Sequence, residues 1–286
     1  MEHYGINIHT ADRHQVNLLP QLGPRLNWVR VDANWRHIEP EPGRFNWDVV
    51  DETIGHAKAQ GYHIYLTLAY TPDWANDGLG PYVPPIEVEH WKRFVRSIGT
   101  LYRDKVVMWG AWNEPNRGFF TGSLQQYVHG ILRPMAEVLH EISPANSIAG
   151  PDLATQGSWP EWLEQFLRHG YPWINVLTVH NYARNGRKVL EEVGGQDTHW
   201  PFTPTVRQVM RSAGQGHLPL AITEFGWNTA DVTEAEQADY YDQFFEAAQS
   251  ADWLLGAIAF NLIDEPPSPH RLWDVRRLER PLERCR

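Results

Sequence analysis

Short apolar runs alternate with longer amphipathic segments from one end of the chain to the other. A run in which nearly every residue is apolar is typical of a buried strand, whereas apolar positions that recur every three to four residues predict a helix. On this basis the sequence predicts eight strands, at 4–9, 26–32, 63–69, 106–113, 147–151, 176–181, 218–224 and 255–261. Between them it predicts seven helices, at about 12–22, 48–60, 87–103, 124–142, 159–169, 204–214 and 233–250.

Several helix ends carry the residues that commonly start or stop a helix. Thr233 stands three residues before Glu236, which is the spacing of a capping box. Gly61 follows the second predicted helix and Gly170 the fifth, as glycine often does. These signals place the helices between the apolar runs and keep the alternation regular.

Strict alternation of apolar strands and helices predicts an α/β fold with a parallel sheet covered by helices. Eight such units close into a (β/α)₈ TIM barrel, and 286 residues suit one barrel domain spanning 1–286. The eighth helix is expected to be short or absent, because 264–270 is rich in proline and 272–286 is short and charged. A doubly wound sheet would place a glycine-rich loop after the first strand, where the chain instead reads His9-Thr10-Ala11.

Composition narrows the range of partners. The chain carries 25 Lys and Arg against 35 Asp and Glu, a net charge of −10, so its overall field disfavours nucleic acid and anionic membranes. The longest apolar stretch, 253–260, is too short to span a bilayer. The opening residues lack a signal-peptide pattern, so a cytoplasmic location is the default, and secretion is expected if a signal was removed. The sequence does not address the oligomeric state.

The fourteen tryptophans are the most unusual feature of the composition. About half are expected to pack in the core. The others stand beside Gly, Pro, Asn or Asp at predicted strand ends, where an indole can cover the apolar face of a sugar and donate its N–H to a hydroxyl. This second group comprises Trp35, Trp74, Trp112, Trp159, Trp200, Trp227 and Trp273.

Two glutamates end two of the predicted strands. Glu114 lies in Trp112-Asn113-Glu114-Pro115 after the fourth apolar run, and Glu224 follows the seventh. A barrel brings the carboxyl ends of its strands together at one face, although the two acids are 224 − 114 = 110 residues apart. Two carboxyl groups that face one another across a cleft are the machinery of glycoside hydrolysis.

The other predicted strand ends are also polar. Since reactive groups of such barrels sit at these ends, the residues there are candidates for the site. They are His9, Arg30, Asp32, Tyr70, Asn113, Asp152, His180, Tyr182, Asn261 and Asp264.

These motifs give the chain a clear likeness to a known group of enzymes. The chain resembles the clan A glycoside hydrolases, (β/α)₈ retaining glycosidases with Asn-Glu at the end of strand four and a second Glu at the end of strand seven. Within the clan it is most similar to family 39, the xylosidase- and iduronidase-like branch. The matching segments are Trp28–Asp32, Trp35 with 38–47, Trp112–Pro115, His180–Tyr182 and Thr223–Trp227.

The resemblance implies that Glu114 is the acid/base and Glu224 the nucleophile of a double displacement, with Asn113 on the sugar 2-hydroxyl. Arg30 and Tyr182 are expected beside Glu224, where a positive charge and a hydrogen bond favour a carboxylate. The expected substrate-binding residues are Arg30, Asn113, His180, Tyr182, Trp74, Tyr70, Trp227, Asn261 and His9. Carbohydrate is the expected partner, most commonly β-linked, and neither a cofactor nor a metal is expected.

Two loops are expected to wall the substrate, 70–85 and 183–203. The second is long for a connection of this kind, which is a frequent sign of function or disorder. It carries Arg184, Arg187 and Lys188 in an otherwise acidic chain. Recognition of an acidic sugar would explain these residues, and so would a solvated loop with scattered charges.

Other functions remain open at this point. A metal-dependent barrel hydrolase would need several converging ligands, often two histidines two apart on the first strand, where Asn7-Ile8-His9 offers one. A carbohydrate-binding barrel without activity would have lost one of the two acids. Transglycosylation, the choice of sugar and linkage, and cleavage within or at the ends of chains depend on the shape of the cleft.

Overall fold

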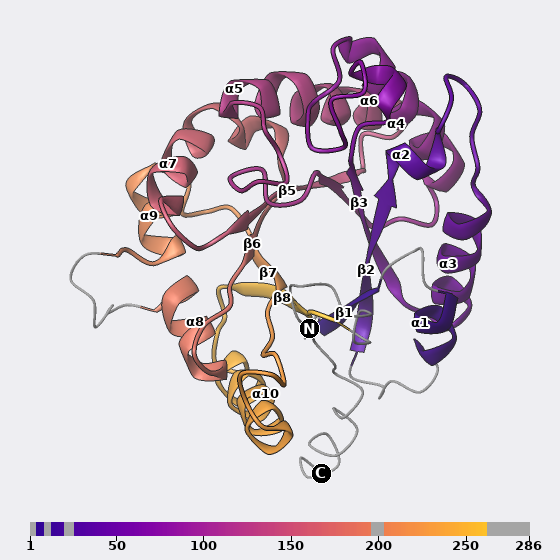
Figure 1. Cartoon of the computed structure of the whole chain (residues 1–286). Helices are drawn as coiled ribbons and strands as arrows, with labels where there is room; N and C mark the ends of the chain where they lie inside the picture. The colour runs from indigo at the N-terminus through magenta and orange to yellow at the C-terminus, as the bar shows by residue number, and fades with distance from the viewer. Residues whose placement is uncertain (1–3, 9–12, 20–25, 196–202, 262–286) are drawn as a thin grey trace.

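The computed structural model describes residues 4–8, 13–19, 26–195 and 203–261. Eight parallel strands form a closed barrel in sequence order, surrounded by helices (Figure 1). Each strand pairs with the next, and the barrel closes where Tyr4 of the first strand pairs with Ala257 of the last. The strands are β1 Tyr4–Ile8, β2 Leu26–Asn34, β3 His63–Ala69, β4 Met108–Ala111, β5 Ser147–Ala154, β6 Val176–His180, β7 Leu220–Glu224 and β8 Leu254–Ala259. The predicted (β/α)₈ fold is confirmed.

The outer helices follow the strands in the predicted order. The α-helices are α1 Arg13–Leu18, α2 Trp35–Ile38, α3 Asp48–Ala59, α4 Val88–Tyr102, α5 Leu124–Gln126, α6 Arg133–Ile142, α7 Trp159–His169, α8 Gly186–Gly194, α9 Val206–Ser212 and α10 Glu234–Ala248. Short turns of helix lie at η2 Asp73–Ala75 and η4 Tyr171–Trp173, and a π-helical turn, η3 Tyr127–Leu132, joins α5 to α6. The prediction for an eighth helix lies outside the described residues.

Helix α8 was not predicted, and it occupies half of the expected long loop at 183–203. Asn185 caps it by accepting a hydrogen bond from the backbone N–H of Lys188. Its apolar face is buried, and Gly186 lies against α10 so closely that a Cβ there would come within 1.8 Å of the carbonyl oxygen of Tyr240. The helix was missed because its polar residues outnumber the few apolar residues of the buried face.

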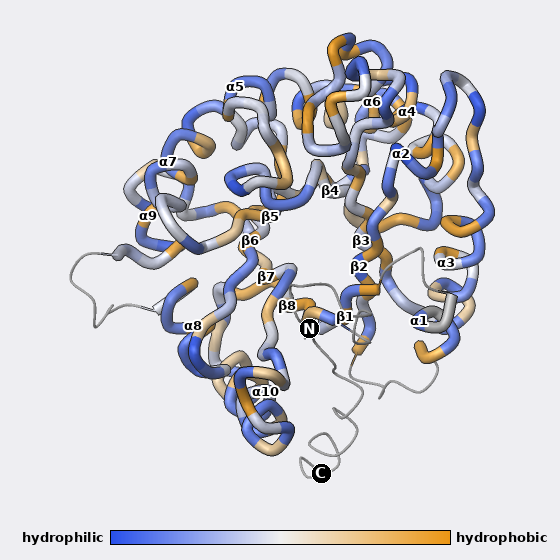
Figure 2. Tube along the Cα trace, viewed as in Figure 1, coloured by the Kyte–Doolittle hydropathy of each residue, from blue (hydrophilic) through white to orange (hydrophobic). Residues whose placement is uncertain are grey.

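The barrel interior changes character along its axis. Alternate strand residues face inward, and the first of these layers is apolar, built from Tyr65, Met108, Ala149, Val176, Ala221 and Ile258. Towards the carboxyl ends of the strands the inward residues become polar, although they are fully buried. Outside the barrel, hydrophilic residues are spread over the helices and loops of the outer ring (Figure 2). A buried polar layer above an apolar floor needs internal partners, so it marks the end of the barrel where a site can be built.

Among the helices in the described part of the chain, none combines the length and the hydrophobicity needed to cross a bilayer.

Candidate active site

Three neighbouring strands end in strained backbone. Tyr70, Trp112, Glu114 and Asp152 all have positive φ, at 72°, 71°, 42° and 53°. A non-glycine residue in this region costs roughly 1–3 kcal/mol and persists where its surroundings hold it, as in active sites. The turn at Trp112 also explains why β4 ends at Ala111, two residues before the predicted strand end.

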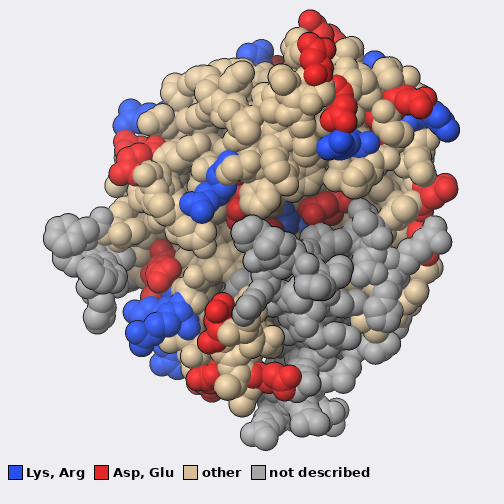
Figure 3. Space-filling model, in the orientation of Figure 1, with Lys and Arg blue, Asp and Glu red and all other residues tan. Residues whose placement is uncertain are grey.

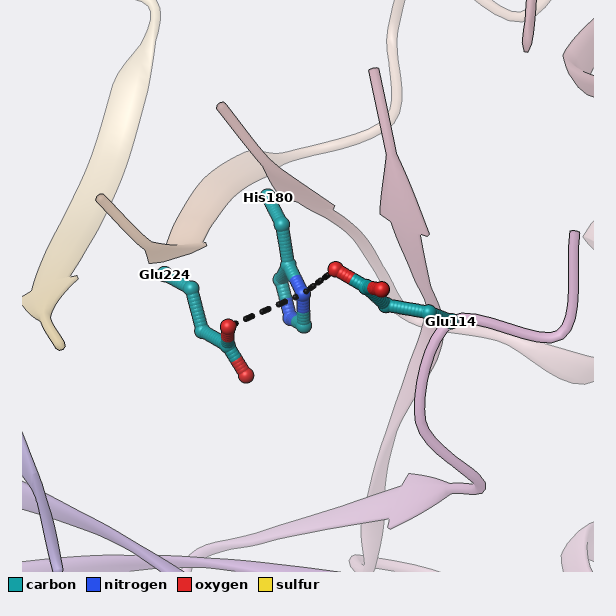
Figure 4. A group of neighbouring side chains, drawn as sticks. All are labelled: Glu114, His180 and Glu224. Carbon is teal, nitrogen blue, oxygen red and sulfur yellow. Dashed lines mark hydrogen bonds and ion pairs between the residues drawn. The ribbon is translucent and has the colours of Figure 1, made fainter. Parts of the chain in front are cut away.

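The structure brings Glu114 and Glu224 together. Both point from opposite sides towards His180, whose ring lies between them (Figure 4). His180 Nδ1 is 2.9 Å from Glu114 Oε1 and 3.4 Å from Glu224 Oε2. A carboxylate oxygen of each glutamate and a ring nitrogen of His180 all lie within 4.8 Å of one another. The side chains of the two glutamates retain 14% and 9% exposure, so the pair faces an accessible space.

Glu224 is held by two hydrogen bonds. Arg30 Nη1 donates to its Oε1 at 2.7 Å, and the hydroxyl of Tyr182 donates to its Oε2 at 2.7 Å. Burial raises the pKa of Glu224 above its ordinary value, and His180, Arg30 and Tyr182 oppose that rise. The sequence predicted both contacts. It did not predict the burial of Glu224, which has the largest effect on the pKa of this carboxyl group.

Arg30 organises the polar layer beneath the pair. It is buried and donates to four acceptors on four strands or strand ends. Nη1 bonds Asn7 as well as Glu224, and Nη2 bonds Asn113 at 2.8 Å and Asp152 at 2.9 Å. Because the oxygen of the Asn113 amide accepts from Arg30, its NH₂ group is left to donate, as the expected contact with a sugar hydroxyl requires.

Asp152 is a third carboxylate of this site. It is 1% exposed and accepts hydrogen bonds from Arg30, from the Tyr65 hydroxyl at 2.8 Å and from Thr223 Oγ1 at 2.7 Å. Its backbone carbonyl accepts from the N–H of Glu114 at 3.1 Å. Burial alone would raise the pKa of Asp152, but Arg30, His180 and the threonine hydroxyls hold it below its ordinary value. Asp152 therefore links the Glu114 turn to Arg30 as a buried carboxylate.

The sequence predicted Asp152 as a strand-end candidate for the site but assigned it no role, and Asn7, Tyr65 and Thr223 were not predicted as site residues. All four face the barrel interior. The available signal was a polar side chain at an inward position of an otherwise apolar strand. It passed unnoticed because the search was confined to the residues at the strand ends.

His180 is fully buried, and its Nδ1 lies close to a carboxyl oxygen of each glutamate. Burial alone would lower its pKa, but the negative charges of Glu224, Glu114 and Asp152 raise it above its ordinary value. Its Nε2 lies 3.9 Å from Asp152 Oδ1. The imidazole can therefore donate a hydrogen bond from Nδ1 to Glu114 while it sits above the Arg30 layer.

Tyr70 and Trp74 lie on the connection from β3 to α4. Tyr70 is half-buried, and its ring packs against Trp112 and Tyr82 at centroid distances of 6.0 and 5.7 Å. Trp74 packs against Trp35 and donates its N–H to the carbonyl of Glu39 at 2.8 Å. The structure thus brings Tyr70 to the side of the site, whereas the contacts of Trp74 are with the turn that follows β2.

Most of the strand-end tryptophans are core residues, and the expectation that they line a cleft is wrong for four of them. These four, at most 5% exposed, are Trp35, Trp112, Trp159 and Trp227. Trp227 donates its N–H to the carbonyl of Ala183, and Trp112 donates to that of Phe119. Trp112 and Trp227 hold loops against the barrel, because their N–H groups are bonded to backbone carbonyls. Trp200 and Trp273 lie outside the described residues.

Asn261 is the remaining candidate that the structure describes, and it lies at the seam of the barrel. Asn261 follows β8 and is buried, and Asn7, two residues before His9, donates to the carbonyls of Thr223 and Ala259. His9 and Asp264 lie outside the described residues.

Of the three basic residues for which acidic-sugar recognition and a solvated loop were both left open, two are engaged in ion pairs. Arg187 lies 3.5 Å from Glu246, and Lys188 pairs with Glu191 within α8. Arg184 is exposed. These pairs favour a solvated helix surface over recognition of a uronic acid by the three side chains together.

Charged side chains also mark the site at the surface. In the face shown in Figure 3, acidic and basic atoms lie side by side in the hollow at its centre, below a largely uncharged surface. Charges that gather in a hollow over the barrel axis agree with the polar layer described above.

Comparison with known proteins supports the fold and the resemblance. No family model matches the chain. A β-xylosidase of Geobacillus stearothermophilus is 20% identical over 242 residues, which make up 70% of this chain and 47% of the xylosidase. The chain therefore spans about half the length of the curated relative it matches.

Comparison with solved structures also supports the fold. A family 39 glycoside hydrolase from Bacteroides cellulosilyticus WH2 superimposes with a TM-score of 0.72 at 17% identity, over 95% of this chain and 59% of that one. XacCel5A, solved in complex with cellopentaose, gives a TM-score of 0.65 at 14% identity, over 96% and 93% of the two chains. The predicted likeness to clan A and family 39 is thus confirmed in the fold.

Proposed function

We propose that this protein is a retaining glycoside hydrolase, with Glu114 as acid/base and Glu224 as nucleophile. The observation that carries the proposal is the approach of the two carboxyl groups, which have oxygens within 4.8 Å of one another. Retaining enzymes place their carboxyl groups roughly 5–5.5 Å apart, whereas inverting enzymes need roughly 6.5–9.5 Å to admit a water molecule. The short separation favours double displacement through a covalent glycosyl-enzyme.

The surroundings of each glutamate support its proposed role. Arg30 and Tyr182 bond both oxygens of Glu224 and favour its carboxylate, which must attack the anomeric carbon. Among the described residues, the ionisable side chain that bonds Glu114 is the imidazole of His180, and Glu114 can deliver a proton to the leaving oxygen. Once Glu224 is bound to the sugar its charge is lost, and Glu114 can then accept a proton from water.

The substrate is proposed to be a β-linked oligo- or polysaccharide. Support comes from the similar β-xylosidase and from the likeness to a protein that was solved with cellopentaose. Asn113, with its NH₂ group directed away from Arg30, is proposed to bond the sugar 2-hydroxyl, a contact that strengthens in the transition state.

One observation favours a second candidate, a metal-dependent hydrolase. Glu114, His180 and Glu224 offer ligand atoms close enough to share one ion. However, Arg30 and Tyr182 already bond the two oxygens of Glu224, and a guanidinium at 2.7 Å would repel a cation. Activity that survives dialysis against a chelator would exclude this candidate.

The test uses a panel of aryl β-glycosides and β-linked oligosaccharides. Wild-type protein and Glu224→Ala are assayed with and without azide. The proposal predicts that azide restores activity to Glu224→Ala and yields a glycosyl azide of inverted configuration. Full activity of Glu224→Ala without azide would overturn the assignment.

A further inference from the structure

Two exposed aromatic rings stand together near the proposed site. Tyr82 is 40% exposed and Phe119 37%, although large aromatic side chains elsewhere in the described chain are mostly buried. Their ring centroids are 5.6 Å apart, and the rings are nearly perpendicular. We call these two residues the rim pair. Neither ring carries a charge, and both present apolar surface to solvent.

The rim pair is continuous with the proposed site. Phe119 belongs to the turn that carries Glu114, and its carbonyl accepts the N–H of Trp112 at 2.7 Å. Tyr82 contacts Tyr70, which in turn contacts Trp112. The rings therefore form a path from the end of β4 outward to the surface.

The segment that carries Tyr82 is held in place. The carbonyl of Tyr82 accepts from the N–H of Thr121 at 3.0 Å, on the Phe119 side. On the opposite side Asn76 Nδ2 donates to the carbonyls of Gly80 and Val83 at 2.7 and 3.0 Å. A surface that is fixed before its ligand arrives loses little entropy on binding, so these clamps favour a binding role.

We propose that the rim pair is a stacking platform for a neutral sugar ring of the substrate chain, outside the pocket that holds the bond to be cleaved. The faces of pyranose rings carry C–H groups that pack on aromatic rings, and the Tyr82 hydroxyl adds one polar group for orientation. The inference rests on the proposed function, because the path of rings leads to the glutamate pair. It implies a substrate of at least two sugar units.

The experiment compares substrates of increasing length. Cleavage by wild type, Tyr82→Ala, Phe119→Ala and the double variant is measured with aryl monoglycosides and with cello- and xylo-oligosaccharides of two to five units. The ratio of kcat/KM for the longest to the shortest substrate should fall about 3- to 10-fold in each single variant, as expected for the loss of one aromatic contact. Tyr82→Phe, which keeps the ring, should retain most of the ratio.

Leu79→Ala is the matched control, since Leu79 is exposed on the same connection but has no ring. It should leave the ratio unchanged. An unchanged ratio in the double variant, or an equal loss on every substrate length, would overturn the platform.

Binding of the same oligosaccharides to Glu224→Gln separates this proposal from the proposed function. Titration calorimetry should show affinity that grows with chain length and falls with removal of the rim pair, even if no substrate were cleaved. If aryl glycosides were cleaved but the rim pair contributed nothing to oligosaccharide binding, the platform proposal would be contradicted and the proposed function would stand. A dimer in sedimentation velocity that Tyr82→Ala disperses, with unchanged oligosaccharide affinity, would identify the rim pair as a contact between copies instead.

Discussion

The two glutamates occupy opposite sides of one hollow, and their surroundings differ. Glu224 stands over the buried layer of Arg30 and Asp152 and has both oxygens bonded. Glu114 sits on a strained turn, is more exposed, and has one side-chain partner, His180, within the part of the chain that the structure describes. A carboxyl group fixed by a cation suits attack on carbon, and one bonded to an imidazole suits repeated proton transfer. The comparison teaches that the partners of each acid, more than its residue type, define its role.

The largest loss of activity is expected from substitution of Glu224. Glu224→Ala removes the proposed nucleophile, so kcat should fall by about 10⁴-fold or more, as for other nucleophiles. The measurement is steady-state cleavage of an aryl β-glycoside. Asp239→Ala, at a surface position of α10, is a suitable control because its carboxyl group is exposed and accepts a hydrogen bond from Gln243 on the same helix. A loss of kcat below tenfold in Glu224→Ala would contradict the role proposed for this carboxylate.

The Glu114 side should respond to the leaving group. Glu114→Ala removes the proposed proton donor, which is worth about 10²–10⁴-fold for a poor leaving group. A dinitrophenyl glycoside needs little protonation, so its first step should lose much less. Azide should yield a glycosyl azide of retained configuration, in contrast to Glu224→Ala. Equal losses of activity on substrates with good and poor leaving groups would contradict the role of Glu114 as an acid.

Asp152 connects the two sides, and Asp152→Asn keeps its shape while removing its charge. We expect kcat/KM to fall roughly 30-fold, equivalent to about 2 kcal/mol, because Arg30 loses one of its two anionic partners. The pKa of His180 should also fall, since one of the charges that raise it is gone. Histidine resonances followed against pH by NMR, with His180→Asn for assignment, measure this without activity. An unchanged His180 titration would contradict the link.

The same variant has a consequence for stability. The folded-state pKa of Asp152 is lowered, so the carboxylate stabilises the fold above the unfolded pKa of about 3.9 and this contribution is lost as pH falls through the folded value. The difference in unfolding free energy between wild type and Asp152→Asn should therefore be constant above about pH 5 and narrow below it. Urea unfolding at several pH values checks this. If the difference in unfolding free energy between the two proteins widened as the pH falls, the predicted direction would be wrong.

The smallest effect is expected at Tyr182. Its hydrogen bond lowers the pKa of Glu224, so Tyr182→Phe should raise that pKa further and move the acid limb of the pH–rate profile to higher pH. The rate at the optimum should fall about tenfold, in line with one hydrogen bond to a charged group. Tyr65→Phe, which loses its bond to Asp152 instead, should move the limb less. A shift to lower pH would be incompatible with the observed contact.

The sequence predicted the order of the elements well, because each strand and helix carries its own periodic pattern. It also paired Glu114 with Glu224 and placed Arg30 and Tyr182 nearby. It could not predict burial, so it overlooked the effect that dominates the pKa of Glu224. The roles of Asp152 and the burial of Trp227 depend on contacts between strands that are distant in sequence, such as Asp152 with Thr223. No local pattern encodes these contacts.

The central claim is that Glu224 attacks the anomeric carbon from the side opposite Glu114. The most direct measurement is to incubate the protein with dinitrophenyl 2-deoxy-2-fluoro-β-glycosides of xylose, glucose and mannose and to sequence the peptides by mass spectrometry. The account predicts one added fluoroglycosyl group on Glu224, and none in Glu224→Gln. A label on Glu114, or turnover of the parent glycosides with no covalent intermediate at Glu224, would contradict it.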